Sequence, residues 1–263
     1  MWNYAAFIFT IWPAAWRSTV AVGKMANLYL VRHGQASFLQ QNYDKLSPLG
    51  EAQSRLLGEY WASRGITFDR VCVGPRARQK DTLELVRAAY RAAALDFPEP
   101  LVLPEFDEYH GEAVLKHGLT ELLETNPEIR ALHSAFVSSA NDSELHANFQ
   151  RLYAAIIGDW VRGVFTVPGV ETWREFAARI NAGLKKFLAG GARGERTAIF
   201  TSGGPIAIAM QRALHLSADD TLQLTWMSRN SSWSEFLYSG ERFTLSTFNS
   251  HAHIVDPAVL TYR

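Results

Sequence analysis

Short apolar runs alternate with segments of helical periodicity along this chain of 263 residues, and this alternation limits its possible folds more than any other feature. Each run has the length and composition of a buried strand. The runs lie at residues 28–31, 70–73, 101–103 and 197–201. The clearest helical segments lie at 48–64, 78–94, 145–161, 173–188 and 205–214. Strands that alternate with helices in this way form a mainly parallel sheet with helices on both faces.

The order of these elements predicts an α/β fold, a three-layer sandwich with a mainly parallel central sheet and a mainly helical cap insertion. The insertion follows the third strand and is expected at about residues 106–190, where helical segments succeed one another without a strand. Alternating residues at 233–238 and 243–248, on either side of Ser239-Gly240, predict a closing hairpin. With 48% hydrophobic residues the chain can bury a core of this size.

Residues 1–24 stand apart from this pattern. They are rich in apolar and aromatic residues, but they include Pro13 and lack the basic start of a secretory signal. We interpret them as a dispensable N-terminal extension that results from a misassigned upstream start, with a weak membrane or partner anchor as the alternative. Residues 25–263 form the main domain, in which we expect no membrane segment. The single cysteine, Cys72, fits a reducing compartment, so a cytoplasmic location is expected.

The charges of the chain balance, with 26 basic and 26 acidic residues. Such a chain has no overall field that would attract a nucleic acid or an anionic membrane. Any basic patch must therefore be local, which fits a small anionic substrate better than a polymer. The sequence carries no signal of oligomeric state.

Arg32, His33 and Gly34 directly follow the first apolar run. In open α/β sheets ligands bind at the carboxyl ends of the strands. A guanidinium can hold a phosphate through two hydrogen bonds, an imidazole can attack phosphorus, and glycine allows the backbone to turn close to a ligand. These three residues therefore predict a phosphate site that contains a nucleophile.

The ends of the second and third strands carry further charges. Arg76, Arg78 and Lys80 follow the second strand, and Arg78 is the one expected to face the site, because it opens a helix whose N-terminus favours anions. Glu105 and Glu108 follow the third strand. Either carboxyl group is a candidate general acid.

Taken in order, these motifs resemble those of the histidine phosphatase superfamily, the phosphoglycerate-mutase-like proteins. The matching segments are Leu30-Val31-Arg32-His33-Gly34, Tyr43-Asp44-Lys45-Leu46-Ser47-Pro48-Leu49-Gly50, Gly74-Pro75-Arg76-Ala77-Arg78 with Thr82, Leu103-Pro104-Glu105 and Gly169-Val170-Glu171-Thr172. Their common order extends the resemblance over roughly residues 27 to 253.

The resemblance implies a phosphomonoester hydrolase that acts on a small phosphorylated substrate without a metal or another cofactor. His33 would form a phosphohistidine, while Arg32 and Arg78 would hold the phosphoryl oxygens. Glu105 would be the acid and base, with Glu108 as its rival. A phosphoglycerate-type mutase is an alternative, although the expected cap lacks the arginine-rich pattern that a doubly charged glycerate would require.

Ser202 is a departure from the family pattern, in which a second histidine follows the fourth strand. We expect Ser202 and Gly203 to contact the substrate there, but a serine donates one hydrogen bond and adds no positive charge. Either another group compensates, such as the backbone amides of Gly203 and Gly204, or the protein is a slow or non-catalytic phosphate-binding, regulatory member. A histidine introduced at 202 should speed phosphorylation, unless the pocket is built around the serine.

His251 and His253 are two potential metal ligands separated by one residue. Two histidines at this spacing near the end of a strand are more often structural than metal-binding, so no metal site is predicted.

Overall fold

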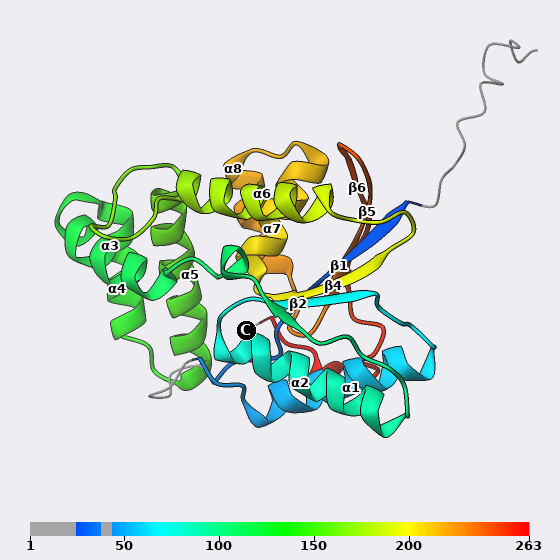
Figure 1. The fold of residues 1–263 in the computed structure, drawn as a ribbon. Helices are drawn as coiled ribbons and strands as arrows, with labels where there is room; N and C mark the ends of the chain where they lie inside the picture. The colour runs from blue at the N-terminus through cyan, green and yellow to red at the C-terminus, as the bar shows by residue number, and fades with distance from the viewer. Residues whose placement is uncertain (1–24, 38–43, 263) are drawn as a thin grey trace, which may run out of the picture.

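The computed structural model describes residues 25–37 and 44–262 (Figure 1). The expectations for residues 1–24 lie outside this described part of the chain. Within the described residues, six strands form one sheet in the order β3-β2-β4-β1-β5-β6. The strands are β1 (Ala26–Arg32), β2 (Arg70–Val73), β3 (Leu101–Val102), β4 (Arg196–Thr201), β5 (Trp233–Ser239) and β6 (Arg242–Ser250). The first four run parallel, and β5 and β6 add an antiparallel hairpin.

Helices cover both faces of the sheet, as the alternating sequence predicts. Figure 1 shows α1 (Pro48–Ser63) and α2 (Ala77–Ala92) on one face, with α6 (Trp173–Ala189) and α7 (Gly203–Leu214) on the other. The expected three-layer α/β sandwich is therefore confirmed. Helix α8 (Ala218–Met227), which follows α7, is not among the helices predicted from the sequence.

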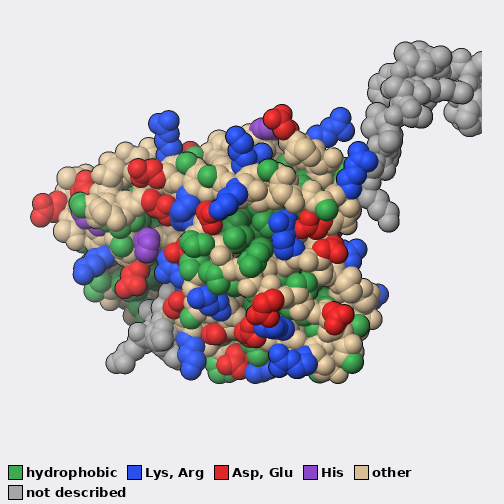
Figure 2. All heavy atoms as spheres, in the orientation of Figure 1, with side chains coloured by type: hydrophobic (Ala, Val, Ile, Leu, Met, Phe, Trp, Pro, Cys, Tyr) green, Lys and Arg blue, Asp and Glu red, His purple; other side chains and the backbone are tan. Residues whose placement is uncertain are grey.

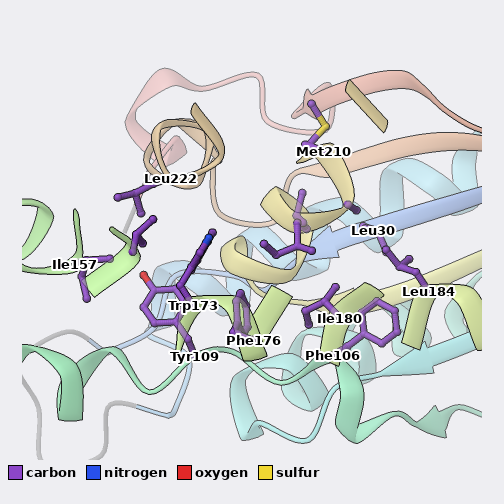
Figure 3. Packing of buried hydrophobic residues seen from close by; sticks show 14 of the residues in the cluster. Leu30, Phe106, Tyr109, Ile157, Trp173, Phe176, Ile180, Leu184, Met210 and Leu222 are labelled. Atoms are coloured by element: carbon purple, nitrogen blue, oxygen red, sulfur yellow. The ribbon is translucent and has the colours of Figure 1, made fainter. Parts of the chain in front are cut away.

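The central strands divide their side chains between two cores, because successive residues of a strand point to opposite faces. Leu28 and Leu30 of β1 belong to the cluster that includes residues of α6 and α7. Tyr29 and Val31, which alternate with them, belong to the cluster beneath α1 and α2. Figure 3 shows Leu30 in the first cluster, near Ile180 and the ring of Phe106. Burial on both faces explains why these strands appear in the sequence as continuous apolar runs.

The helical insertion contains α3 (Gly111–Thr125), α4 (Pro127–Val137) and α5 (Asp142–Val161), which extend to one side of the sheet in Figure 1. Helix α6 returns to the sheet, where Ile180 and Leu184 pack in the same cluster as Leu30. Of the range of about 106–190 expected for the cap, α3, α4 and α5 extend away from the sheet, whereas α6 packs against it. Trp160 of α5 joins the same core, so the cap and the sheet share one continuous apolar interior.

The surface agrees with the balanced composition. Basic and acidic side chains are interspersed on the face drawn in Figure 2, and hydrophobic side chains are exposed near its centre. Leu101 and Val102 of the edge strand β3 are 57% and 52% exposed, and they are the two residues of the predicted run that form a ladder with β2. Within the described residues, no helix combines the length and apolar character needed to cross a membrane.

Candidate active site

Three parallel strands deliver the predicted residues to one edge of the sheet. Arg32 at the end of β1 is in register with Thr201 at the end of β4, and Val73 of β2 is in register with Phe200. A cavity of about 100 Å³ lies at this edge. It is lined by Arg32, His33, Arg78, Glu108 and Gly203, together with side chains from the cap.

His33 is held as a neutral imidazole whose Nε2 carries the lone pair. Its Nδ1 lies 2.7 Å from the carbonyl oxygen of Gly34, which can only accept, so Nδ1–H is the donor. Nε2 accepts a hydrogen bond from Nε of Arg78 at 3.0 Å. Burial lowers the pKa of His33 well below its usual value, and the nearby charges of Arg78 and Arg32 lower it further. An uncharged ring nitrogen therefore faces two fixed cations.

Backbone contacts fix the segment that carries His33. The His33 N–H donates to the carbonyl oxygen of Thr201 at 3.0 Å, and the N–H of Ser231 donates to the carbonyl oxygen of His33 at 3.1 Å. A β-carbon on Gly34 would lie 2.3 Å from the carbonyl oxygen of Gly50, so glycine is required for the first strand to end this close to α1. The side-chain position of His33 is thus defined by both neighbouring strands and by α1.

Two buried arginines provide the positive charge. Arg32 Nη1 donates to the carbonyl oxygen of Ser228. Arg78 Nη1 donates to Oδ1 of Asp44 at 2.8 Å, while Oδ2 of the same carboxylate accepts from the N–H of Ala77 at 2.9 Å. Asp44 therefore holds Arg78 and the first turn of α2 together. Two guanidinium groups beside a neutral imidazole are suited to bind a phosphoryl group.

Glu108 contributes a buried carboxyl group to the cavity. Its Oε2 accepts from the N–H of Gly204 at 3.1 Å, and its Oε1 accepts from the N–H of Tyr109 at 3.1 Å. Burial raises the pKa of Glu108, although these two hydrogen bonds and the charges of Arg78 and Arg32 act in the opposite direction. Of the two candidate acids, only Glu108 lines the cavity that contains His33.

Glu105, the acid that the resemblance implied, lies elsewhere, and this is a correction to the expected site. The chain forms a single 3₁₀ turn, η3 (Pro104–Phe106), directly after β3. This turn sends Phe106 into the core and places the Cβ of Glu105 against Gly183 of α6, with its carboxylate 3.5 Å from Lys186 Nζ. Glu105 lines a different pocket beside α6.

Ser202 is also positioned differently from the expectation. Its side chain is fully buried, and its Oγ accepts a hydrogen bond from Nε2 of Gln79 at 2.8 Å. Gly203, the first residue of α7, lines the cavity in its place. Because the N–H of Gly204 is donated to Glu108, only one of the two expected glycine amides remains for a substrate.

The cap, helix α8 and the loop before β5 add residues to the cavity that the sequence analysis did not single out for this site. These are Tyr109, Gly111, Glu112 and Tyr153 on the cap side, and Thr225 and Asn230 on the other. Asn230 Nδ2 donates to the carbonyl oxygen of His33 at 3.4 Å. They come from segments far apart in the sequence, and no spacing rule connects them with the motif at residues 32–34.

His251 and His253 have separate environments. His251 lies against the guanidinium of Arg229, whereas His253 Nε2 lies 2.7 Å from Oγ of the buried Ser231. In residues 25–37 and 44–262, histidine, cysteine and acidic side chains do not gather in threes as a metal site would require.

A family model for the histidine phosphatase superfamily (branch 1) matches residues 28–156 and 112–251. The chain therefore belongs to the histidine phosphatase superfamily.

Three individual proteins illustrate its similarities. A broad-specificity phosphatase from Saccharomyces cerevisiae is 40% identical over 65 residues, which are 22% of this chain and 28% of the yeast protein. The crystal structure of a phosphoglycerate mutase from Bacillus anthracis superposes with a TM-score of 0.59 at 16% identity, covering 88% of this chain and 96% of that one. The crystal structure of an alpha-ribazole phosphatase from Shigella flexneri superposes with a TM-score of 0.55 at 19% identity, covering 88% of this chain and 99% of that one. At these identities the two structures support the fold alone.

Proposed function

We propose that this protein is a phosphomonoester hydrolase that acts on a small phosphorylated substrate through a phosphohistidine at His33. The observation that carries the proposal is the state of the imidazole: it is neutral, its Nε2 lone pair faces the cavity, and two buried arginines flank it. The relatives include a phosphatase described as having broad specificity, which supports the reaction class.

In the first step, Nε2 of His33 attacks phosphorus as the bond between phosphorus and the leaving oxygen breaks. Arg32, Arg78 and the N–H of Gly203 would stabilise the three peripheral oxygens, on which negative charge is concentrated. Formation of the new N–P bond leaves the imidazole positively charged. The hydrogen bond from Nδ1 to the carbonyl oxygen of Gly34 stabilises that charge.

Glu108 would give its proton to the leaving oxygen, so the departing group leaves as an alcohol. This role requires a protonated carboxyl group, and the raised pKa of Glu108 supports it. In the second step the resulting carboxylate takes a proton from water, whose oxygen attacks phosphorus. The N–P bond then breaks, which returns neutral His33 and releases phosphate. Both steps use protein groups and water.

A mutase and a phosphate-binding protein are the two alternatives to a hydrolase. Glu112 lines the cap side of the cavity, and its negative charge disfavours the doubly charged glycerate that a mutase would hold. The hydrogen bond that Ser202 receives from Gln79 favours the alternative of a slow or non-catalytic phosphate binder, because the hydroxyl adds no charge to the site.

Turnover of p-nitrophenyl phosphate and of a panel of phosphorylated metabolites separates these functions. The proposal predicts release of inorganic phosphate by the wild-type protein and none above background by His33→Ala. Phosphate binding without turnover would instead identify a binding protein. Transfer to a second hydroxyl group without phosphate release would identify a mutase.

A further inference from the structure

Gln79 connects two turns of the site that approach each other from different strands. Its amide Nε2 donates to Oγ of Ser202 at 2.8 Å, and its Oε1 accepts from the N–H of Arg76 at 3.1 Å. The side chain is fully buried. A β-carbon on Gly74 would lie 2.2 Å from this Oε1, so the glycine at the end of β2 leaves the space that the amide occupies.

Each end of this link leads to a group in the cavity. Arg76 is the residue before α2, two positions before Arg78, and its guanidinium reaches the loop of the acid: Nε lies 2.5 Å from Asp107 Oδ1, and Nη2 donates to the carbonyl oxygen of Glu108 at 3.2 Å. Ser202 directly precedes Gly203. The Gln79 amide therefore ties the turn that carries Arg78 to the turn that carries Gly203, and Arg76 adds the turn that carries Glu108.

We propose that Gln79 is a positioning residue that holds the three turns carrying Arg78, Glu108 and Gly203 at the spacing needed for phosphoryl binding. It occupies the space beside residue 202, so the pocket is built around the serine. This inference rests on the proposed function for its meaning in catalysis, but its effect on phosphate binding is independent of turnover. Groups held within a few tenths of an ångström are essential to such sites, and small displacements reduce rates strongly.

The chemistry of the side chain suits this position. A primary amide donates from one end and accepts at the other, so it satisfies a backbone N–H and a buried hydroxyl at once without adding charge. Methionine has a similar length and fills the space but forms neither bond. Gln79→Met therefore removes the link while it preserves packing.

The first test compares Gln79→Met with Thr197→Val. Thr197 is equally buried, lies at the opposite end of β4 and donates to Glu195 at 3.0 Å, so its variant loses a buried hydrogen bond away from the cavity. We measure thermal unfolding, kcat and KM for p-nitrophenyl phosphate, and the Kd of inorganic phosphate. Gln79→Met is expected to lose roughly 10- to 100-fold in kcat/KM and to bind phosphate more weakly. Thr197→Val is expected to keep the wild-type kcat/KM and the wild-type phosphate Kd.

The second test introduces the missing histidine with and without the glutamine. Ser202→His alone is expected to lower kcat/KM, because Gln79 fills the space next to residue 202. In Ser202→His combined with Gln79→Ala, that space is open. In that background Ser202→His should raise kcat/KM above the value of Gln79→Ala alone, the reverse of its effect in the wild-type background, and it should add an ionisation to the pH profile that Gln79→Ala lacks.

The outcomes separate this inference from the proposed function. Equal effects of Gln79→Met and Thr197→Val on kinetics and phosphate affinity would overturn the positioning role, as would an effect of Ser202→His that is the same in both backgrounds. If the wild-type protein hydrolyses no substrate, the proposed function fails, and the phosphate Kd of Gln79→Met still decides the inference. A wild-type protein that neither turns over nor binds phosphate would overturn both.

Discussion

Nε of Arg78 donates a hydrogen bond to Nε2 of His33 across 3.0 Å, so the cation proposed to bind phosphate is hydrogen-bonded to the proposed nucleophilic atom. The contact fixes the tautomer of the ring and keeps it uncharged, because a second proton on Nε2 would face the guanidinium. The same hydrogen bond engages the lone pair of His33 Nε2. A phosphoryl group that enters the cavity must attract this donor to its own oxygens before Nε2 can attack, and the same movement then stabilises the charge of the transition state.

Asp44 should control how well Arg78 performs this exchange. Its carboxylate accepts from Nη1 of Arg78 and from the N–H of Ala77. Asp44→Ala removes both acceptors, and we expect KM for a phosphomonoester to rise about tenfold, with a smaller change in kcat. Steady-state kinetics measure this difference. Glu51→Ala, which removes a solvent-exposed ion pair with Arg55, is the control and should leave both constants unchanged.

Glu108 and Glu105 can be distinguished by the leaving group of the substrate. Glu108→Gln cannot donate a proton, so hydrolysis of an alkyl phosphate should fall by about 10²- to 10⁴-fold. Phosphorylation by p-nitrophenyl phosphate should fall much less, because its leaving group departs without a proton. Glu105→Gln should retain both activities, since Glu105 contacts Lys186 outside the cavity. Loss of alkyl phosphate hydrolysis in Glu105→Gln alone would contradict this assignment.

The pH dependence of kcat/KM follows from the same two groups. His33 must be neutral to attack, and its pKa lies well below 6.5, so activity should persist as the pH falls through 6.5. Glu108 must be protonated to donate, so activity toward an alkyl phosphate should fall as the pH rises through its raised pKa. Glu108→Gln should remove this alkaline decline. A wild-type profile that loses activity with an apparent pKa of 6.5 on its acidic side would argue against a neutral His33.

His253 should make the stability of the fold sensitive to acid. Burial, followed by the charge of His251, lowers the pKa of His253 from 6.5 to about 3. The group contributes stability that is complete above pH 6.5 and is lost as the pH falls toward 3, because the unfolded chain binds the proton first. Between pH 6.5 and pH 5 this amounts to about 2 kcal/mol in the free energy of unfolding.

Urea unfolding of wild type and His253→Gln at pH 7 and pH 5 measures that contribution. The loss of stability between the two pH values should be about 2 kcal/mol smaller in the variant. The contribution of the buried His33 is common to both proteins and cancels in the comparison. Equal losses in the two proteins would show that His253 titrates normally in the folded state.

The sequence predicted the residues whose position depends on strand ends alone. Arg32 ends β1, His33 follows it, and Arg78 lies in the first turn of α2, the helix after β2. Because β1 and β2 both pair in parallel with β4, their carboxyl ends bring these residues together. Glu105 lies outside the cavity and Glu108, its rival in the sequence analysis, lines it, because a single 3₁₀ turn follows β3. Sequence patterns give little information on so short a turn.

Sequence patterns could not predict contacts between distant segments. Gln79 and Ser202 are 123 positions apart, and nothing in either segment signals that an amide will meet a hydroxyl there. The cap side chains that line the cavity, such as Tyr153, depend on the docking of α5 against α6 and α8. The order of the elements was therefore predictable, whereas the details that determine substrate choice required the tertiary structure.

The most direct test of the central claim is to trap the phosphoenzyme. We would mix Glu108→Gln with p-nitrophenyl phosphate, quench within milliseconds in alkaline denaturant, and locate the modification by peptide mass spectrometry. Without the base for water attack, a phosphoryl group should accumulate on His33, be lost on mild acid treatment, and be absent from a variant that also carries His33→Ala. Turnover of phosphomonoesters with no phosphorylated His33, or with the phosphoryl group on another residue, would contradict the account.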